Sequence, residues 1–288
     1  MKPAKFEYHA PTSVEQALSI LERYHGEARV LAGGQSLVPM MNFRLATPAA
    51  IVDLNRISGL AEIAAADGVV TIGAMARQRQ VEFAPLIGEY LPLLRDAMRY
   101  VGHPPIRTRG TIGGSIANAD PAAEIPMILQ VMAGEVVVRG PQRERRIAAA
   151  DLFVAPLTTS LAADEIIIEV RFPAMAPGAR YAIEEFARRK GDFAIAAIAV
   201  VLVQEGERCA MARLATAGIG PVPVRLRDAE AILEQRGLGE AAIAAAASKA
   251  AELVDPMSDH NATADFRRHL TAVLTRRAVQ KALMGSPP

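Results

Sequence analysis

The sequence predicts an α+β protein in two parts, and three observations carry this prediction. The chain opens in the order β-α-β and places a glycine pair directly after a strand. The segment from Pro173 to Gly178 holds two prolines and a glycine, so we place a domain boundary there, between residues 1–175 and 178–288. Beyond it, two strand-like runs precede helices, which is typical of a smaller α+β domain with an antiparallel sheet.

The first elements are well signalled. Ser13 is a good helix cap and Gln16 stands three residues later, so a capping box predicts a helix that ends at Gly26. Its apolar side chains recur at helical spacing. Strands are expected at 28–31, 51–54 and 69–72, and we divide the first domain into subdomains at about 1–57 and 58–175.

Further along the first domain, the apolar spacing predicts one helix over 86–101, which the prolines after His103 should break. Residues 107–126 are rich in Gly, Asn and Asp, and they fit neither a linker nor a single strand. Strands are expected at 135–139 and 166–172.

The second domain begins with two runs that resemble paired strands, at 193–203 and 209–217. Three helices follow. They are expected at 228–235, 241–253 and 265–283, and Gly285 with the proline tail should end the last one.

Composition excludes several classes of function. The net charge is +1 with no long basic cluster, so nucleic acid is not an expected partner. One cysteine, Cys209, cannot hold an iron–sulfur cluster, and the five histidines show no metal-ligand spacing. Neither a secretory signal nor a membrane span is expected, which favours a cytoplasmic protein.

Two similar glycine loops are the strongest chemical signal. One reads Ala32-Gly33-Gly34-Gln35-Ser36-Leu37, and the other reads Gly110-Thr111-Ile112-Gly113-Gly114-Ser115-Ile116. Glycines let the backbone approach a ligand, successive N–H groups can form an anion site, and serine hydroxyls add donors. With both loops expected at strand ends, they could clamp a diphosphate from two sides. Neither loop has the spacing of a Rossmann or a P-loop motif.

Over nearly its whole length, the chain resembles the FAD-binding medium subunit of the molybdenum hydroxylases, of the xanthine dehydrogenase and aerobic carbon monoxide dehydrogenase type. The resemblance rests on four segments: Phe6 to Pro11, Ala32 to Leu37, Ile106 to Pro126, and Arg188 to Ala194. Within the third, Gly110 to Pro121 is the most specific part. The resemblance implies an N-terminal FAD-binding domain of the vanillyl-alcohol oxidase (PCMH-like) fold and no catalytic side chain on this chain.

The resemblance also implies which residues contact FAD. The two glycine loops would hold its diphosphate, and Asn118 and Asp120 would line the ribityl or diphosphate region. Glu124 stands where relatives have an acidic residue near the flavin. Phe193 stands where carbon monoxide dehydrogenases have a tyrosine against the flavin ring. The full expected set is Ala32, Gly33, Gly34, Gln35, Ser36, Leu37, Thr111, Ile112, Gly113, Gly114, Ser115, Asn118, Asp120, Glu124, Ile166, Ile167, Lys190 and Phe193.

Three departures from the family pattern matter. Pro105 replaces a glutamine that usually precedes Ile-Arg in the family, and Phe193 replaces the tyrosine and so lacks its hydroxyl. Both changes weaken the case for carbon monoxide as the substrate. Gln35 replaces a histidine of some relatives, so the flavin should be bound non-covalently. For the cluster Arg188-Arg189-Lys190, contact with phosphate, contact with a partner subunit and a solvated turn all stay open.

The resemblance implies a partnership with a large molybdopterin-cofactor subunit and a small [2Fe–2S] subunit, as a dimer of heterotrimers. This chain would pass electrons from the clusters to an external acceptor. Two alternatives stay open: a self-sufficient flavin oxidoreductase of the vanillyl-alcohol oxidase type, and a non-enzymatic binding protein that kept the fold.

Overall fold

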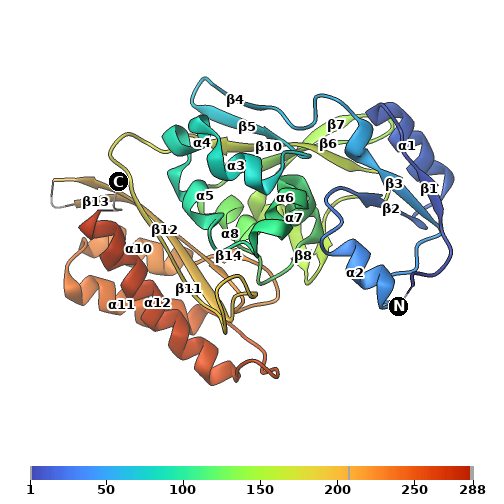
Figure 1. Cartoon of the computed structure of the whole chain (residues 1–288). Coiled ribbons are helices and arrows are strands. Elements are labelled where there is room, and N and C mark those ends of the chain that lie inside the picture. Colours follow the sequence, from blue (N-terminus) through green and yellow to red (C-terminus); the bar gives the residue numbers. More distant parts are fainter. Residues whose placement is uncertain (1, 207, 286–288) are drawn as a thin grey trace.

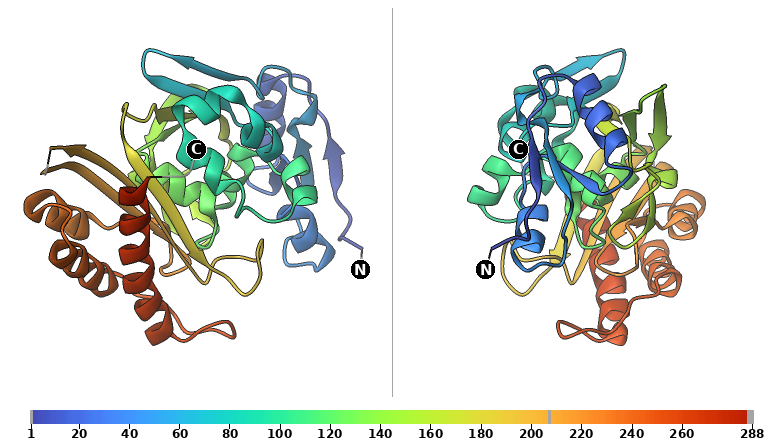
Figure 2. Two further views of the ribbon diagram at one scale, coloured as in Figure 1. Left: turned by 60° about the vertical axis from the view of Figure 1, so that its left-hand side comes forward. Right: turned by 90° about the vertical axis from the view of Figure 1, so that its right-hand side faces the viewer.

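The computed structural model describes residues 2–206 and 208–285 and shows three main sheets with helices between and around them (Figures 1 and 2). The first sheet is parallel, with β3 between its neighbours. Its strands are β1 (Glu7–His9), β2 (Ala28–Leu31) and β3 (Ala50–Asp53). The helix α1 (Val14–Arg23) packs against it through Ala17, Leu18 and Leu21, which confirms the predicted apolar stripe.

The cap of α1 also follows the sequence prediction. The Ser13 hydroxyl accepts the Gln16 N–H at 3.2 Å, and Gln16 Oε1 accepts the N–H of Thr12 at 2.9 Å. The first bond satisfies one of the N–H groups that a helix start leaves without partners, and the second holds the residue before the cap.

The second sheet is antiparallel, in the order β4-β5-β10-β6-β7. Its strands are β4 (Ile63–Ala66), β5 (Val69–Gly73), β6 (Glu135–Arg139), β7 (Glu144–Ala148) and β10 (Ile166–Pro173). Short elements join the sheets: α2 (Leu37–Asn42), the 3₁₀ turn η1 (Leu54–Arg56), α9 (Ala149–Leu152), and the hairpin of β8 (Phe153–Ala155) and β9 (Thr158–Thr159).

Between β5 and β6 the chain folds into six short helices, and two sequence predictions need correction there. The helices are α3 (Gln78–Phe83), α4 (Pro85–Tyr90), α5 (Pro92–Ala97), α6 (Pro104–Arg109), α7 (Ile112–Asn118) and α8 (Glu124–Val131). The single helix expected over 86–101 is wrong, because Pro92 begins a new helix after Leu91. The prolines after His103 start α6, since a proline at the first helical position costs no hydrogen bond.

The third sheet is antiparallel, in the order β11-β12-β13-β14, and three helices cover one side of it. The strands are β11 (Arg180–Phe186), β12 (Ala196–Glu205), β13 (Arg208–Ala217) and β14 (Val224–Arg225). The helices are α10 (Arg227–Arg236), α11 (Glu240–Leu253) and α12 (Ala264–Met284), close to the three that the sequence predicts. The two final prolines of the predicted tail lie outside the described residues.

The third sheet is buried on both faces (Figures 1 and 2). On one face of β12, Ala197, Ala199 and Val201 belong to the core around α5 and α8. On the other, Ile198 and Val200 belong to the core beneath the last three helices. Packing is therefore continuous across the predicted domain boundary.

Candidate cofactor site

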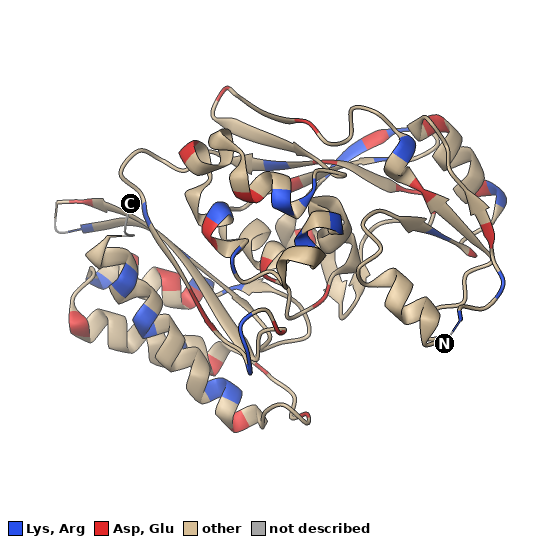
Figure 3. Ribbon diagram, viewed as in Figure 1, with Lys and Arg blue, Asp and Glu red and all other residues tan. Residues whose placement is uncertain are grey.

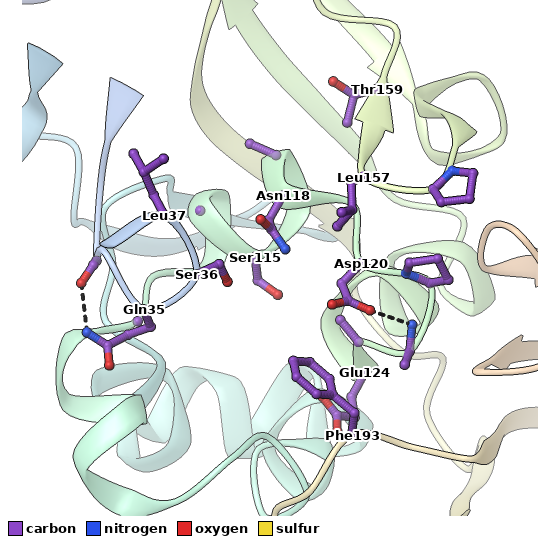
Figure 4. Close-up of a pocket in the computed structure, with 18 of the residues that line it drawn as sticks. Gln35, Ser36, Leu37, Ser115, Asn118, Asp120, Glu124, Leu157, Thr159 and Phe193 are labelled. Carbon is purple, nitrogen blue, oxygen red and sulfur yellow. Dashed lines mark hydrogen bonds between the residues drawn. The ribbon is translucent and has the colours of Figure 1, made fainter. Parts of the chain in front are cut away.

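A cleft of about 1480 Å³ runs between the first glycine loop and the segment before β12. Its wall comes from both glycine loops, the β8–β9 hairpin, the strand β10 and residues 254–261 of the C-terminal part. Small-ligand pockets usually measure about 300–1000 Å³, so this cleft has room for a dinucleotide. Figure 4 shows Ser36, Ser115 and Asp120 facing the same open space.

The first glycine loop, residues 32–36, presents free backbone donors. The N–H groups of Gly33, Gly34, Gln35 and Ser36 have no acceptor among the described residues. Successive backbone N–H groups that face a cleft without an internal partner form a concave site that suits an anion. Gly34 has φ = +74°, which lets the chain turn there.

One side-chain donor and one backbone donor bind carbonyl groups of this loop. Gln35 Nε2 donates to Gly33 O at 3.0 Å, and Val38 N donates to Gly34 O at 3.1 Å. In a trans peptide the C=O and the next N–H point in opposite directions. The N–H of Gly34 therefore points away from the Gln35 amide that binds Gly33 O. In the same way, the N–H of Gln35 points away from the Val38 N–H that binds Gly34 O.

The second glycine loop differs from the expected strand-end turn, because Gly113 and Gly114 lie in the first turn of α7. Its donors are already used within the protein. Gly113 N donates to Ala74 O at 2.9 Å, Gly114 N to Thr111 Oγ1 at 3.0 Å, and Ser115 N to Thr111 O at 3.1 Å. Only the first loop therefore has a row of free N–H groups, while the second offers side chains such as those of Ser115 and Asn118.

The glycines also let the two loops touch. A Cβ on Gly33 would lie 2.3 Å from Arg109 O, and one on Gly114 would lie 3.3 Å from the Ala32 Cβ. The loops therefore form one continuous wall, and the two-sided clamp expected from the sequence is not what the structure builds.

Two carboxyl groups, those of Asp120 and Glu124, line the cleft, and Glu185 interacts with Glu124. Asp120 lies in the turn before α8, where its Oδ1 accepts the Ala122 N–H at 2.9 Å (Figure 4). Burial raises its pKa. Asp120 and Glu124 do not share a helical face, because α8 begins only at Glu124.

Glu124 and Glu185 interact with each other, although they come from different domains. Burial raises the pKa of Glu124 to about 7, and burial together with the nearby Glu124 charge raises the pKa of Glu185 to about 8. Like charges in contact disfavour double ionisation, so the pair holds one proton near neutral pH.

The remaining expected residues lie in different surroundings. Phe193 lines the cleft with 67% of its surface exposed, and Ile166 and Ile167 line it from β10. Ile112 is fully buried in the core and Lys190 is exposed, and neither lines the cleft. The other sixteen expected residues all do.

Sequence reasoning missed the β8–β9 hairpin, which closes one side of the cleft. Leu157 N donates to Ala119 O at 3.0 Å, and both residues have positive φ, at +56° and +49°. Such backbone is uncommon outside glycine and is frequent at functional sites. Leucine and alanine rarely adopt positive φ, so nothing in the sequence indicates this backbone conformation or the contact that it allows.

Arg107 of α6 is buried, although it is a charged residue. It donates to Glu82 Oε2 at 3.1 Å and to the carbonyls of Val101 and Gly102 at 3.0 Å each. Because Gly102 and Ile106 line the cleft, this ion pair fixes the part of its wall formed by α6 and the preceding turn.

Charged residues of both signs are scattered over the two domains (Figure 3). Within residues 2–206 and 208–285, no group of His, Cys, Asp and Glu side chains is placed to hold a metal ion. No helix in this part of the chain combines the length and the apolar character needed to cross a membrane.

Comparison with known proteins agrees with this geometry. The family described as the FAD binding domain in molybdopterin dehydrogenase matches residues 4–175, and the CO dehydrogenase flavoprotein C-terminal domain matches residues 181–282. The 6-hydroxypseudooxynicotine dehydrogenase complex subunit alpha of Paenarthrobacter nicotinovorans is 39% identical over 100% of this chain and 98% of its own length.

Two further relatives cover nearly the whole chain. Caffeine dehydrogenase subunit beta of Pseudomonas sp. is 36% identical over 98% of this chain and 96% of its own length. A chain of the solved carbon monoxide dehydrogenase of Hydrogenophaga pseudoflava is 36% identical, with a TM-score of 0.97 over 99% of both chains. The chain therefore belongs to the FAD-binding medium subunits of the molybdenum hydroxylases, a family of oxidoreductases, and its cofactor is FAD.

Proposed function

We propose that this chain binds FAD non-covalently in the cleft and passes electrons from the [2Fe–2S] clusters of a partner subunit to an external acceptor. The observation that carries the proposal is the row of free N–H groups at Gly33, Gly34, Gln35 and Ser36. They fit the diphosphate, and the volume of the cleft, about 1480 Å³, leaves room for the rest of the cofactor.

Different residues of the cleft bind different parts of the cofactor. The hydroxyls of Ser36 and Ser115 donate to phosphate oxygens, and Asn118 with Asp120 lines the middle of the cleft. Phe193 provides an exposed aromatic surface for the flavin ring. When bound, FAD supplies the redox chemistry, because it accepts one or two electrons.

Two features of the chain support this division of labour. Its single cysteine, Cys209, is buried, so the iron–sulfur clusters have to come from a partner. The Gln35 side chain is turned back onto its own loop and offers no nucleophile for a covalent flavin link. We propose partnership with a large molybdopterin subunit and a small [2Fe–2S] subunit, as a cytoplasmic dimer of heterotrimers, with residues 1–175 as the FAD-binding domain.

The test is to purify the complex through a tag on this chain and to measure its flavin. We expect one FAD per chain, released into the supernatant by heat. Ser36→Ala combined with Ser115→Ala should weaken FAD binding at least about tenfold, because a hydrogen bond to a charged group contributes about 1.5–3 kcal/mol.

Ser248→Ala is the matched control, because Ser248 lies exposed on α11, away from the cleft lining. Flavin that stays with the denatured protein would contradict non-covalent binding. Turnover of an alcohol or an amine by this chain without partners would favour a self-sufficient oxidase instead.

A further inference from the structure

A chain of polar side chains connects the two glycine loops from behind the cleft. Asn55 Nδ2 donates to Ala32 O at 2.9 Å, in the first loop. Asn55 Oδ1 accepts from Arg77 Nη2 at 2.5 Å, and Arg77 Nη1 donates to Arg109 O, just before the second loop. Neither Asn55 nor Arg77 lines the cleft.

The orientation of the Asn55 amide is determined by its neighbours. Arg77 has only donors, so it requires the amide oxygen. Ala32 O and Asp53 Oδ1 accept only, so they require the amide nitrogen, which lies 2.5 Å from the Asp53 oxygen. Tyr8 donates to the other oxygen of Asp53 at 2.6 Å and holds that carboxylate in place.

This arrangement acts on the first free donor of the anion site. Because the peptide between Ala32 and Gly33 is planar and trans, a donor on Ala32 O turns the Gly33 N–H to the opposite side. That side is away from Asn55, which lies outside the cleft lining.

Arg77 also holds the second glycine loop in place. Besides its bond to Arg109 O, its backbone pairs with Thr111 in an isolated bridge. The residues joined in this way, Ala32 and Arg109, lie next to the glycines where the two loops touch.

We propose that Asn55 and Arg77 are positioning residues of the cofactor site, which aim the Gly33 N–H at the FAD diphosphate and lock the two loops together without touching the cofactor. This inference rests on the proposed function, since it takes the first loop as the diphosphate site. It assigns a role to two side chains outside the cleft.

The test uses the purified complex after its flavin has been removed. The variants Asn55→Ala and Arg77→Lys are titrated with FAD, with ADP and with riboflavin. ADP carries the diphosphate and riboflavin lacks it. Arg77→Lys keeps the charge, so it separates positioning from simple attraction, and Arg99→Lys, on an exposed arginine, is the control.

We expect the Kd for FAD and for ADP to rise about three- to tenfold in both variants, the range of one ordinary hydrogen bond. The Kd for riboflavin and the melting temperature of the flavin-free complex should stay unchanged. Since both residues act through one chain of bonds, the double variant should be little worse than the weaker-binding single variant.

Two results would overturn the inference. The first is a Kd for FAD and for ADP within twofold of the wild-type value in both variants. The second is a Kd for riboflavin that rises as much as the Kd for ADP, because that indicates a general distortion of the site. If the unaltered complex binds neither FAD nor ADP, the diphosphate site itself is wrong, and that failure is visible without any variant.

Discussion

Two neighbouring glutamates of β11, Glu184 and Glu185, contact partners of opposite charge, because successive side chains of a strand point to opposite faces. Glu184 accepts from Lys281 of α12 at 2.6 Å, whereas Glu185 meets Glu124 at the start of α8. One glutamate is thus paired with a cation, and the next must share a proton with another carboxyl.

Replacing Glu185 by glutamine tests this shared proton. The raised pKa values mean that the folded state holds protons that the unfolded state releases above the ordinary glutamate value of about 4.5. The stability contribution of the pair is therefore complete at low pH and is lost as the pH rises through about 7 to 8.

We expect the melting temperature of the wild-type chain to fall between pH 6 and pH 9 and that of Glu185→Gln to fall less. One pKa unit is worth about 1.4 kcal/mol, and about 1 kcal/mol moves the melting temperature of a chain this size by about 2–4 °C. Several degrees should thus separate the two proteins at pH 9. Glu205→Gln, at an exposed ion pair, should follow wild type. Parallel curves for Glu185→Gln and wild type would show that no proton is shared.

Among the elements, α7 depends on close backbone contact. A Cβ on Gly113 would lie 2.5 Å from the Ala74 Cβ and 2.8 Å from the Ala74 carbonyl oxygen. The N–H of the same glycine donates to that carbonyl, so the helix cannot shift without losing a hydrogen bond.

Gly113→Ala should therefore destabilise the flavin-free protein, by about 1–3 kcal/mol, as overpacking usually does. A thermal melt in the absence of FAD measures this effect apart from cofactor binding. Gly239→Ser is the comparison, because a Cβ at Gly239 meets nothing within 4 Å and serine suits the helix cap there. Equal melting temperatures for both variants would show that α7 can move.

The elements also show what a sequence can predict. The strands at Ala28–Leu31 and Glu135–Arg139 were placed to the residue, and the first helix was located through its Ser13 cap, because local patterns specify them. The helices α6 and α7 were missed, since proline and glycine disguise helices that tertiary contacts stabilise.

The candidate site divides in the same way. Sixteen expected residues line the cleft: ten belong to the two glycine loops, which carry local signals, and the other six were expected only from the resemblance to the family. The pairing of Glu124 with Glu185 joins positions far apart in the sequence. The left-handed backbone at Ala119 and Leu157 could not be predicted either, because alanine and leucine rarely adopt it. Both features arise from tertiary packing.

At the scale of the whole molecule, the two domains share a core. Ala197, Ala199 and Val201 of β12 pack with side chains of the first domain, and Arg213 Nη1 donates to Met132 O at 3.0 Å across the boundary. The chain should therefore behave as one cooperative unit, although its sequence divides into two families.

Calorimetry of the full chain should show one unfolding transition. A fragment of residues 1–175 should aggregate or unfold, because it would expose the apolar surface that the third sheet covers. Two separate transitions, or a fragment with sharp melting of its own, would show that the shared core contributes little.

The burial of β12 on both faces limits how this strand can evolve. Toward the first domain it presents the small side chains of Ala197 and Ala199, and toward the C-terminal helices it presents Ile198 and Leu202. An insertion or deletion of one residue would exchange the two sets, forcing large side chains into the tighter side and opening voids on the other. Sequence drift in this strand is thus confined to substitutions that keep volume, while length changes are left to the turns.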